Sequence, residues 1–146
     1  MKKLLSLLML TAVLMAEQGI RWETDYDAAL AKAKTLDRPI FFVFSRHSCK
    51  WCRHLEETTF KNPEVIARLN GAFVNVVAYT DDGDFVPGAL WSPGTPALWF
   101  LDSRGETMFP AIPGAVGAAD FLHATDIVLE EYKARRVPRR SLRGTP

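Results

Sequence analysis

The sequence predicts an α/β protein in which a central mixed β-sheet is flanked by helices. Two apolar runs, residues 40–44 and 73–79, are rich in aromatic and β-branched side chains, which indicates strands buried on both faces. A helical stretch lies between them, and this succession implies a parallel pair joined by a right-handed crossover. Two shorter runs, residues 97–101 and 106–109, flank a turn signal and predict a hairpin.

Local signals place the remaining elements. Asp25 can cap a helix from about Tyr26 to Leu36, which contains four alanines and ends at Arg38-Pro39. The other expected elements are a short strand at Ile20 to Trp22, a helical stretch that begins at the cysteines, a helix from Asn62-Pro63 to Asn70-Gly71, a loop from Thr80 to Gly94 with room for one helical turn, and a last amphipathic helix from about Ala118 to Tyr132.

The two ends of the chain differ in composition from its body. Residues 1–16 begin with two lysines, continue with an apolar run too short to span a bilayer, and end at Ala16, which is the layout of a cleaved signal peptide. Residues 135–146 are basic and contain proline and glycine, so we expect a disordered tail that can touch anionic membrane surfaces. A single domain over residues 17–134 remains.

The charge and the spacing of the cysteines restrict the classes of function that fit this sequence. Residues 17–132 carry 10 Lys and Arg against 17 Asp and Glu, and an acidic body of this kind argues against nucleic acid as a partner. The two cysteines are separated by only two residues, so a bridge between them closes a very short loop and stabilises little. This spacing favours redox chemistry over an inert structural bridge.

The pair Cys49 and Cys52 stands where a buried strand leads into a helix. Unpaired N–H groups and the helix dipole there stabilise a thiolate at Cys49, and positive charge from Lys50, Arg46 and a protonated His47 adds to this effect. We therefore expect Cys49 to attack substrate disulfides and Cys52, one turn further along, to resolve the mixed disulfide.

With these motifs, residues 20–132 resemble the thioredoxin superfamily, and more closely the small periplasmic thioredoxin-like proteins related to the C-terminal domain of transmembrane thiol reductant transporters. The resemblance rests on Arg38-Pro39-Ile40-Phe41, on Cys49 to Cys52, and on Thr95-Pro96 before Asp102-Ser103-Arg104-Gly105. It implies a thioredoxin-like fold, a cis bond before Pro96, and a Thr95 backbone that pairs with the substrate chain.

The resemblance also implies an activity and its partners. We expect a periplasmic thiol:disulfide oxidoreductase that reduces or exchanges disulfides in protein clients, receives electrons from a membrane thiol donor and needs no cofactor. Trp51 can add an apolar contact for clients. Lys50-Trp51 replaces the Gly-Pro pair of thioredoxins, so the direction of electron flow does not transfer.

A second departure concerns proton transfer. Many thioredoxins carry a buried acid six residues before the first cysteine, and this chain has Val43 there. Glu56 lies on the helical face of both cysteines and can substitute for that acid, although an ordinary surface glutamate is the more usual explanation.

A different class of function also fits the same segment. His47 and His54 flank the dithiol and, with Cys49 and Cys52, offer four ligands that suit zinc or copper. The alternative to the oxidoreductase is therefore a metal-binding or metallochaperone module.

Overall fold

The computed structural model describes residues 18–23 and 25–142, and these form a five-stranded mixed sheet with the strand order β1-β3-β2-β4-β5. β1, β3 and β2 are parallel, β4 is antiparallel to β2, and β5 is antiparallel to β4. The predicted α/β class is therefore confirmed, with β2 at the centre. The strands are β1 (Trp22–Glu23), β2 (Ile40–Ser45), β3 (Val74–Tyr79), β4 (Ala97–Leu101) and β5 (Ile112–Pro113).

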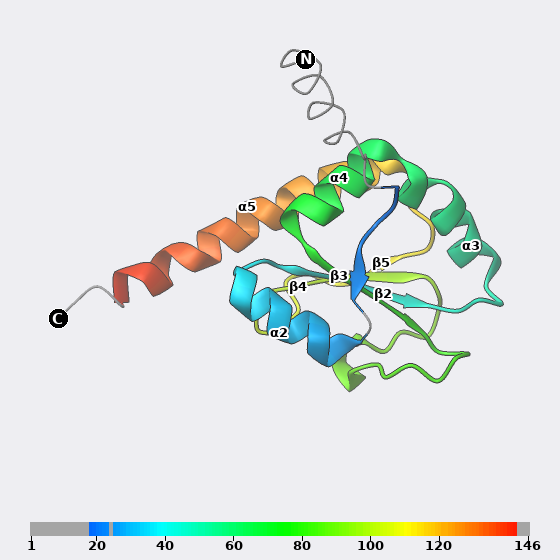
Figure 1. The fold of residues 1–146 in the computed structure, drawn as a ribbon, viewed down its shortest axis with the longest axis horizontal. Helices are drawn as coiled ribbons and strands as arrows, with labels where there is room; N and C mark the ends of the chain where they lie inside the picture. The colour runs from blue at the N-terminus through cyan, green and yellow to red at the C-terminus, as the bar shows by residue number, and fades with distance from the viewer. Residues whose placement is uncertain (1–17, 24, 143–146) are drawn as a thin grey trace, which may run out of the picture.

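Helices cover both faces of the sheet (Figure 1). α2 lies on one face, while α4 and the first part of α5 lie on the other, with α3 at one end of the molecule. The helices are α2 (Tyr26–Leu36), α3 (Lys50–Glu57), α4 (Pro63–Ala72) and α5 (Ala118–Leu142), with 3-10 turns at Thr59–Lys61 and Gly88–Leu90.

The central strand divides the core into two layers. Because side chains alternate along a strand, Phe41 and Val43 point into the layer beneath α3, α4 and α5, whereas Ile40, Phe42 and Phe44 point toward α2. All five side chains are buried, which explains why the sequence shows no polar alternation in this run.

The predicted N-termini of α2 and α4 are confirmed by the hydrogen bonds of their capping residues. The Asp25 side chain accepts a hydrogen bond from the Ala28 N–H at 2.7 Å. The Asn62 side chain accepts from the Glu64 and Val65 N–H groups at 2.9 and 3.3 Å, with Pro63 in the first turn. Both caps satisfy N–H groups that have no partner within their helix.

Several predicted bounds differ from the observed ones, and the first strand is Trp22–Glu23 instead of Ile20 to Trp22. The turn at residues 102–105 forms, and the chain after it pairs briefly with β4 through a bridge between Thr107 and Leu101 and a hydrogen bond from the Met108 N–H to the Phe100 carbonyl at 2.9 Å. No regular strand forms over residues 106–109, and the strand that pairs with β4 is β5. Pro110 cannot donate to a ladder, and Met108 is buried in the core. α4 continues through Asn70-Gly71 to Ala72, because Asn70 is fixed by tertiary hydrogen bonds to the chain before β1.

The last helix is longer than its apolar pattern indicates. α5 continues past Tyr132 to Leu142 and so enters the segment expected to be a disordered tail. The predicted signal peptide and residues 143–146 lie outside the described residues. Within the described part of the chain, no helix is long and apolar enough to cross a membrane.

Candidate active site

Three loops meet at one edge of the sheet. β2 and β3 are parallel and in register, with Ser45 opposite Tyr79, so the loops that follow them leave the sheet side by side. β4 is antiparallel to β2 and begins at this same edge, which brings the preceding Thr95-Pro96 segment to the loop after β2. This edge therefore joins the dithiol with two loops that are distant in sequence.

Cys49 is the N-cap residue of α3. Its backbone is extended (φ −87°, ψ 118°), and its Sγ accepts a hydrogen bond from the Cys52 N–H at 3.1 Å. Burial raises the pKa of the Cys49 thiol, but hydrogen bonds, led by those with Cys52, outweigh it and lower the pKa below its ordinary value. The helix start thus favours the thiolate, as the sequence predicted.

Cys52 lies in a different environment. Its side chain is 1% exposed, and both cysteines are free thiols in the structure. Burial is the main cause that raises the pKa of Cys52, the hydrogen bond with Cys49 adds to it, and a hydrogen bond with Ser45 opposes it. The two sulfurs therefore differ in both access and acidity, with Cys49 the more available nucleophile.

The Thr95–Pro96 bond is cis, as the resemblance implied. The Cys49 thiol donates to the carbonyl oxygen of Thr95 across 3.4 Å, and Pro96 is buried. The role of these residues in substrate binding stays a prediction.

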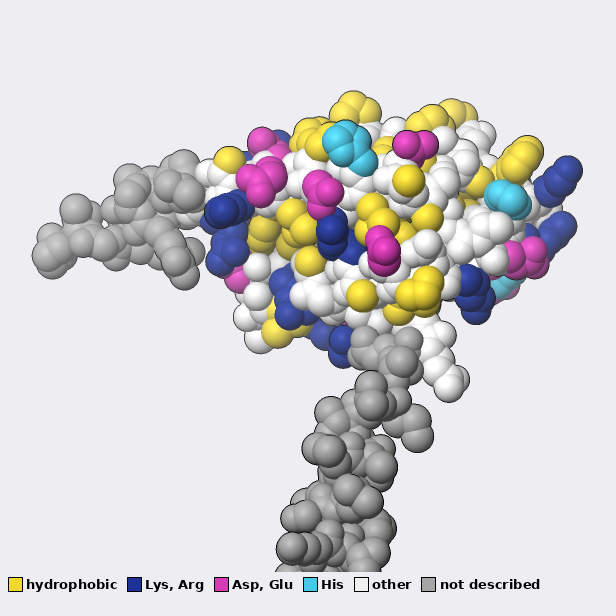
Figure 2. Space-filling view, turned by 90° about the horizontal axis from the view of Figure 1, so that it is seen from above, with side chains coloured by type: hydrophobic (Ala, Val, Ile, Leu, Met, Phe, Trp, Pro, Cys, Tyr) yellow, Lys and Arg dark blue, Asp and Glu magenta, His cyan; other side chains and the backbone are white. Residues whose placement is uncertain are grey.

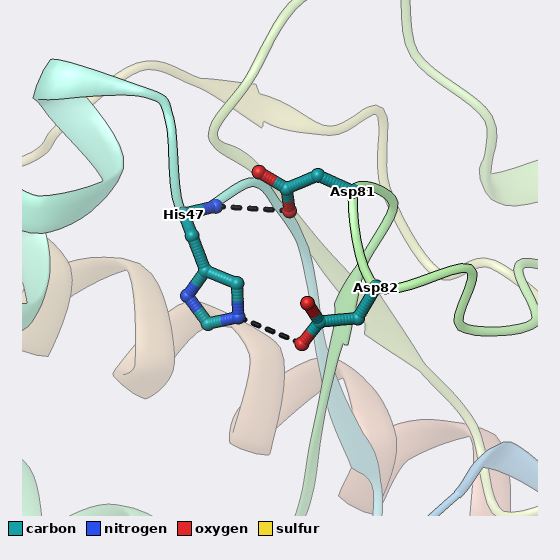
Figure 3. Close-up of side chains that lie close together, drawn as sticks. All are labelled: His47, Asp81 and Asp82. Atoms are coloured by element: carbon teal, nitrogen blue, oxygen red, sulfur yellow. Dashed lines mark hydrogen bonds and ion pairs between the residues drawn. The ribbon is translucent and has the colours of Figure 1, made fainter.

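His47 is fixed to the loop that follows β3 (Figure 3). Its Nε2 lies 2.8 Å from Oδ2 of Asp82, and its ring stacks on Tyr79 at 3.9 Å with an interplanar angle of 8°. The hydrogen bond with Asp82 is the main cause that raises the pKa of His47, and the charges of Asp81 and Glu56 act in the same direction. Protonated His47 is therefore paired with acids beside the dithiol.

The exposed side chains of α3 lie at one end of the molecule, where Figure 2 shows basic and histidine side chains gathered. Trp51 is 55% exposed, Lys50 Nζ lies 5.5 Å from the centre of its ring, and His54 packs edge-on against it. An exposed indole beside Cys49 is available to a client, so the predicted role of Trp51 remains open to test.

Glu56 is half-buried and engaged by another side chain. Its Oε1 accepts a hydrogen bond from the Tyr79 hydroxyl at 2.9 Å. Burial, followed by Glu56 itself, raises the pKa of Tyr79. Val43 is buried in the core, so no acid occupies the position used in many thioredoxins.

The four residues of the metal-binding alternative do not converge. Among the described residues, the only group of three or more potential ligands whose donor atoms lie within 4.8 Å of one another is His47, Asp81 and Asp82. Neither cysteine belongs to it. The structure therefore gives no support to a site built from Cys49, Cys52, His47 and His54.

The sequence motifs do not predict four further residues of the site, Ser45, Tyr79, Asp81 and Asp82. A signal for them exists, because each stands at or just after the carboxyl end of one of two adjacent parallel strands, and such ends share an edge of the sheet. The register that places them beside the dithiol is a tertiary property.

The mixed sheet, the dithiol at the start of α3 and the cis proline beside it define a thioredoxin-like protein. Comparison with known families assigns this thioredoxin-like protein to one of them. The chain belongs to the family Thioredox_DsbH, described as "Protein of unknown function, DUF255", whose model matches residues 8–83.

Known relatives and structures agree with this placement. The rat (Rattus norvegicus) protein "Spermatogenesis-associated protein 20" is 36% identical over 112 residues, which cover 68% of this chain but only 14% of the relative. A putative disulphide-isomerase from Bacteroides thetaiotaomicron superposes with a TM-score of 0.65 at 26% identity, over 77% of this chain and 95% of that one. A thioredoxin from Thermus thermophilus gives 0.64 at 24% identity, over 76% and 88%, which shows the shared fold.

Proposed function

We propose that this protein is an exported thiol:disulfide oxidoreductase that reduces or exchanges disulfides in protein clients. The observation that carries the proposal is the asymmetric dithiol, in which Cys49 is partly exposed and has a lowered pKa, whereas Cys52 is buried and has a raised one. An attacking thiol needs access and thiolate character, whereas a resolving thiol needs to stay protonated and protected until the mixed disulfide has formed.

The reaction proceeds in two exchanges. The Cys49 thiolate attacks one sulfur of a client disulfide, a mixed disulfide forms, and the departing client sulfur takes up a proton. Cys52 then loses its proton and attacks Cys49 Sγ, which forms the Cys49–Cys52 disulfide and releases the second client thiol. Two electrons pass to the client, and a dithiol donor must return two electrons to the protein.

Reduction or exchange is favoured over net oxidation by the resemblance to small periplasmic thioredoxin-like proteins. The hydrogen bond to the Cys49 thiolate stabilises the reduced form and so makes the disulfide more oxidising, but one N–H at the start of a helix of only eight residues limits this effect. A redox titration of the purified dithiol against glutathione measures this balance, and a potential well above that of glutathione would reject the reductase assignment.

Export is supported by the sequence, and a membrane donor by the family resemblance. The lysines at positions 2 and 3 and the apolar run that follows them favour secretion, and an oxidising compartment supplies disulfide clients. Protein recovered from its native host should begin near Glu17. Recovery of the full-length chain from the cytosol would reject both the compartment and the membrane donor.

The oxidoreductase itself is tested with a matched pair of variants. Cys52→Ser should accumulate mixed disulfides between Cys49 and client proteins, because the resolving sulfur is gone. Cys49→Ser should trap none, although it keeps one cysteine as well. Equal trapping by both variants, or no reduction of insulin by the unmodified protein, would contradict the proposal.

A further inference from the structure

The loop between β2 and Cys49 is held by one carboxylate from another part of the chain. Asp81 Oδ1 accepts a hydrogen bond from the His47 N–H at 3.0 Å (Figure 3). Asp81 Oδ2 accepts one from the Ser48 N–H, also at 3.0 Å. Both oxygens of Asp81 are thus used on consecutive backbone groups of a loop whose residues 46–48 are exposed. The same hydrogen bonds, led by that with His47, keep the pKa of Asp81 below its usual value.

Further contacts hold the same loop in register. The Thr80 N–H donates to the Ser45 carbonyl at 3.1 Å and extends the pairing of β2 with β3 up to Asp81. On the other side, the Arg53 guanidinium of α3 donates to the His47 carbonyl at 3.0 Å. The loop is therefore fixed from both the end of β3 and the helix that carries the dithiol.

The position of this loop determines the conformation of Cys49. The Cys49 N–H donates to the Arg46 carbonyl at 3.2 Å, and only the extended backbone of Cys49 lets its sulfur accept from the Cys52 N–H. A loop that moved would release this hydrogen bond to the thiolate. Asp81 lies outside the dithiol motif and reaches the sulfur only through the backbone of His47 and Ser48.

We propose that Asp81 is a positioning residue that holds the loop before Cys49 in the conformation in which the helix start stabilises the Cys49 thiolate. The proposal rests on the proposed function for its consequence in catalysis. Asp81 needs no ion for this role, because each of its two oxygens already accepts a hydrogen bond from an N–H group of the loop.

The charge of Asp81 offers a way to separate positioning from simple electrostatics. A carboxylate near a thiolate disfavours it by repulsion, so removal of the charge alone should lower the pKa of Cys49. Removal of the loop contact should raise it. The two effects have opposite signs.

The experiment measures the rate of iodoacetamide alkylation of Cys49 against pH in the reduced full chain. Asp81→Ala should raise the pKa of Cys49 and slow alkylation at pH 6 by about three- to tenfold, the effect expected for loss of charge-assisted hydrogen bonds at an exposed site. Asp84→Asn is the matched control, because it removes one negative charge from the same loop while its side-chain oxygen can still accept from the Tyr79 N–H. The control should alkylate at the unmodified rate or slightly faster.

Each possible result either supports or overturns the positioning role of Asp81. A Cys49 pKa that falls in Asp81→Ala, or does not change while the variant stays folded by circular dichroism, would overturn the positioning role. Alkylation that depends on added zinc, and loses this dependence in Asp82→Asn, would assign the cluster to a metal and overturn it too. The alkylation profile does not require turnover, so an inactive protein with the expected profile would reject the proposed function and keep this inference.

Discussion

Unequal reactivity of the two thiols is the sharpest expectation from the structure. When the reduced protein meets a limiting amount of iodoacetamide at pH 6, Cys49 should react at least about tenfold faster than Cys52. Each unit that separates two thiol pKa values changes the thiolate fraction about tenfold. The more acidic thiol is a weaker nucleophile, which reduces its advantage in alkylation rate about threefold. The pKa of Cys49 is lowered and that of Cys52 is raised, so this net factor favours Cys49.

Access increases the difference. Cys52 is 1% exposed and must wait for a local opening of the structure before a reagent reaches it, whereas Cys49 is partly exposed. The two contributions act in the same direction, so even a small separation of the pKa values leaves Cys49 ahead by about an order of magnitude.

The assay can assign the label to either cysteine. Chymotrypsin cleaves after Phe44 and Trp51, so Cys49 and Cys52 fall on different peptides whose labelled fractions are read by mass spectrometry. Unfolded protein in denaturant is the control, where the two rates should converge. Equal labelling in the folded protein, or faster labelling of Cys52, would refute the assignment of Cys49 as the attacking thiol.

Three further predictions follow from contacts of the site and of the protein interior. Replacing His47 and His54 together by Ala should leave insulin reduction measurable, because neither ring supplies a reacting sulfur. The amount of bound metal should also be unchanged. Loss of stoichiometric metal together with absence of disulfide exchange would favour a metal-binding module. In NMR titrations the pKa of His47 should lie above 6.5 and fall in Asp82→Asn; the ion pair stabilises the fold fully below pH 6.5 and is lost as the pH rises through the raised value, and an unchanged titration would contradict the pairing. Thr59→Val should lower the free energy of unfolding by about 1–2 kcal/mol in urea titrations, because the Val116 carbonyl loses a hydrogen bond; a neutral effect would show that this contact is dispensable.

The absence of an acid at position 43 has a consequence for proton transfer. Val43 packs in the core layer beneath α3, and Glu56, the residue expected to substitute for the missing acid, accepts a hydrogen bond from the Tyr79 hydroxyl. The proton that leaves Cys52 must therefore go to water or to a group that is not in the position of the usual buried acid.

Sequence alone determined the α/β class, the helix starts at Asp25 and Asn62, and the place of the dithiol at a strand-to-helix junction. These features depend on local physics: hydrophobic periodicity, capping chemistry and the short reach of a two-residue spacing. The sequence motifs within residues 20–132 also identify the thioredoxin-like fold without knowledge of tertiary contacts.

Tertiary structure decided what surrounds the dithiol. The hairpin expected after β4 is shorter than predicted, because the Met108 N–H still donates to the Phe100 carbonyl but the chain then reaches Pro110, which cannot donate to a ladder. Asp81 contacts the loop before Cys49 only because β2 and β3 are parallel and in register. This arrangement brings residues that are 33 or 34 positions apart in the sequence within hydrogen-bond distance. Contacts of this kind depend on the strand order and register of the whole sheet, and no local sequence signal determines those.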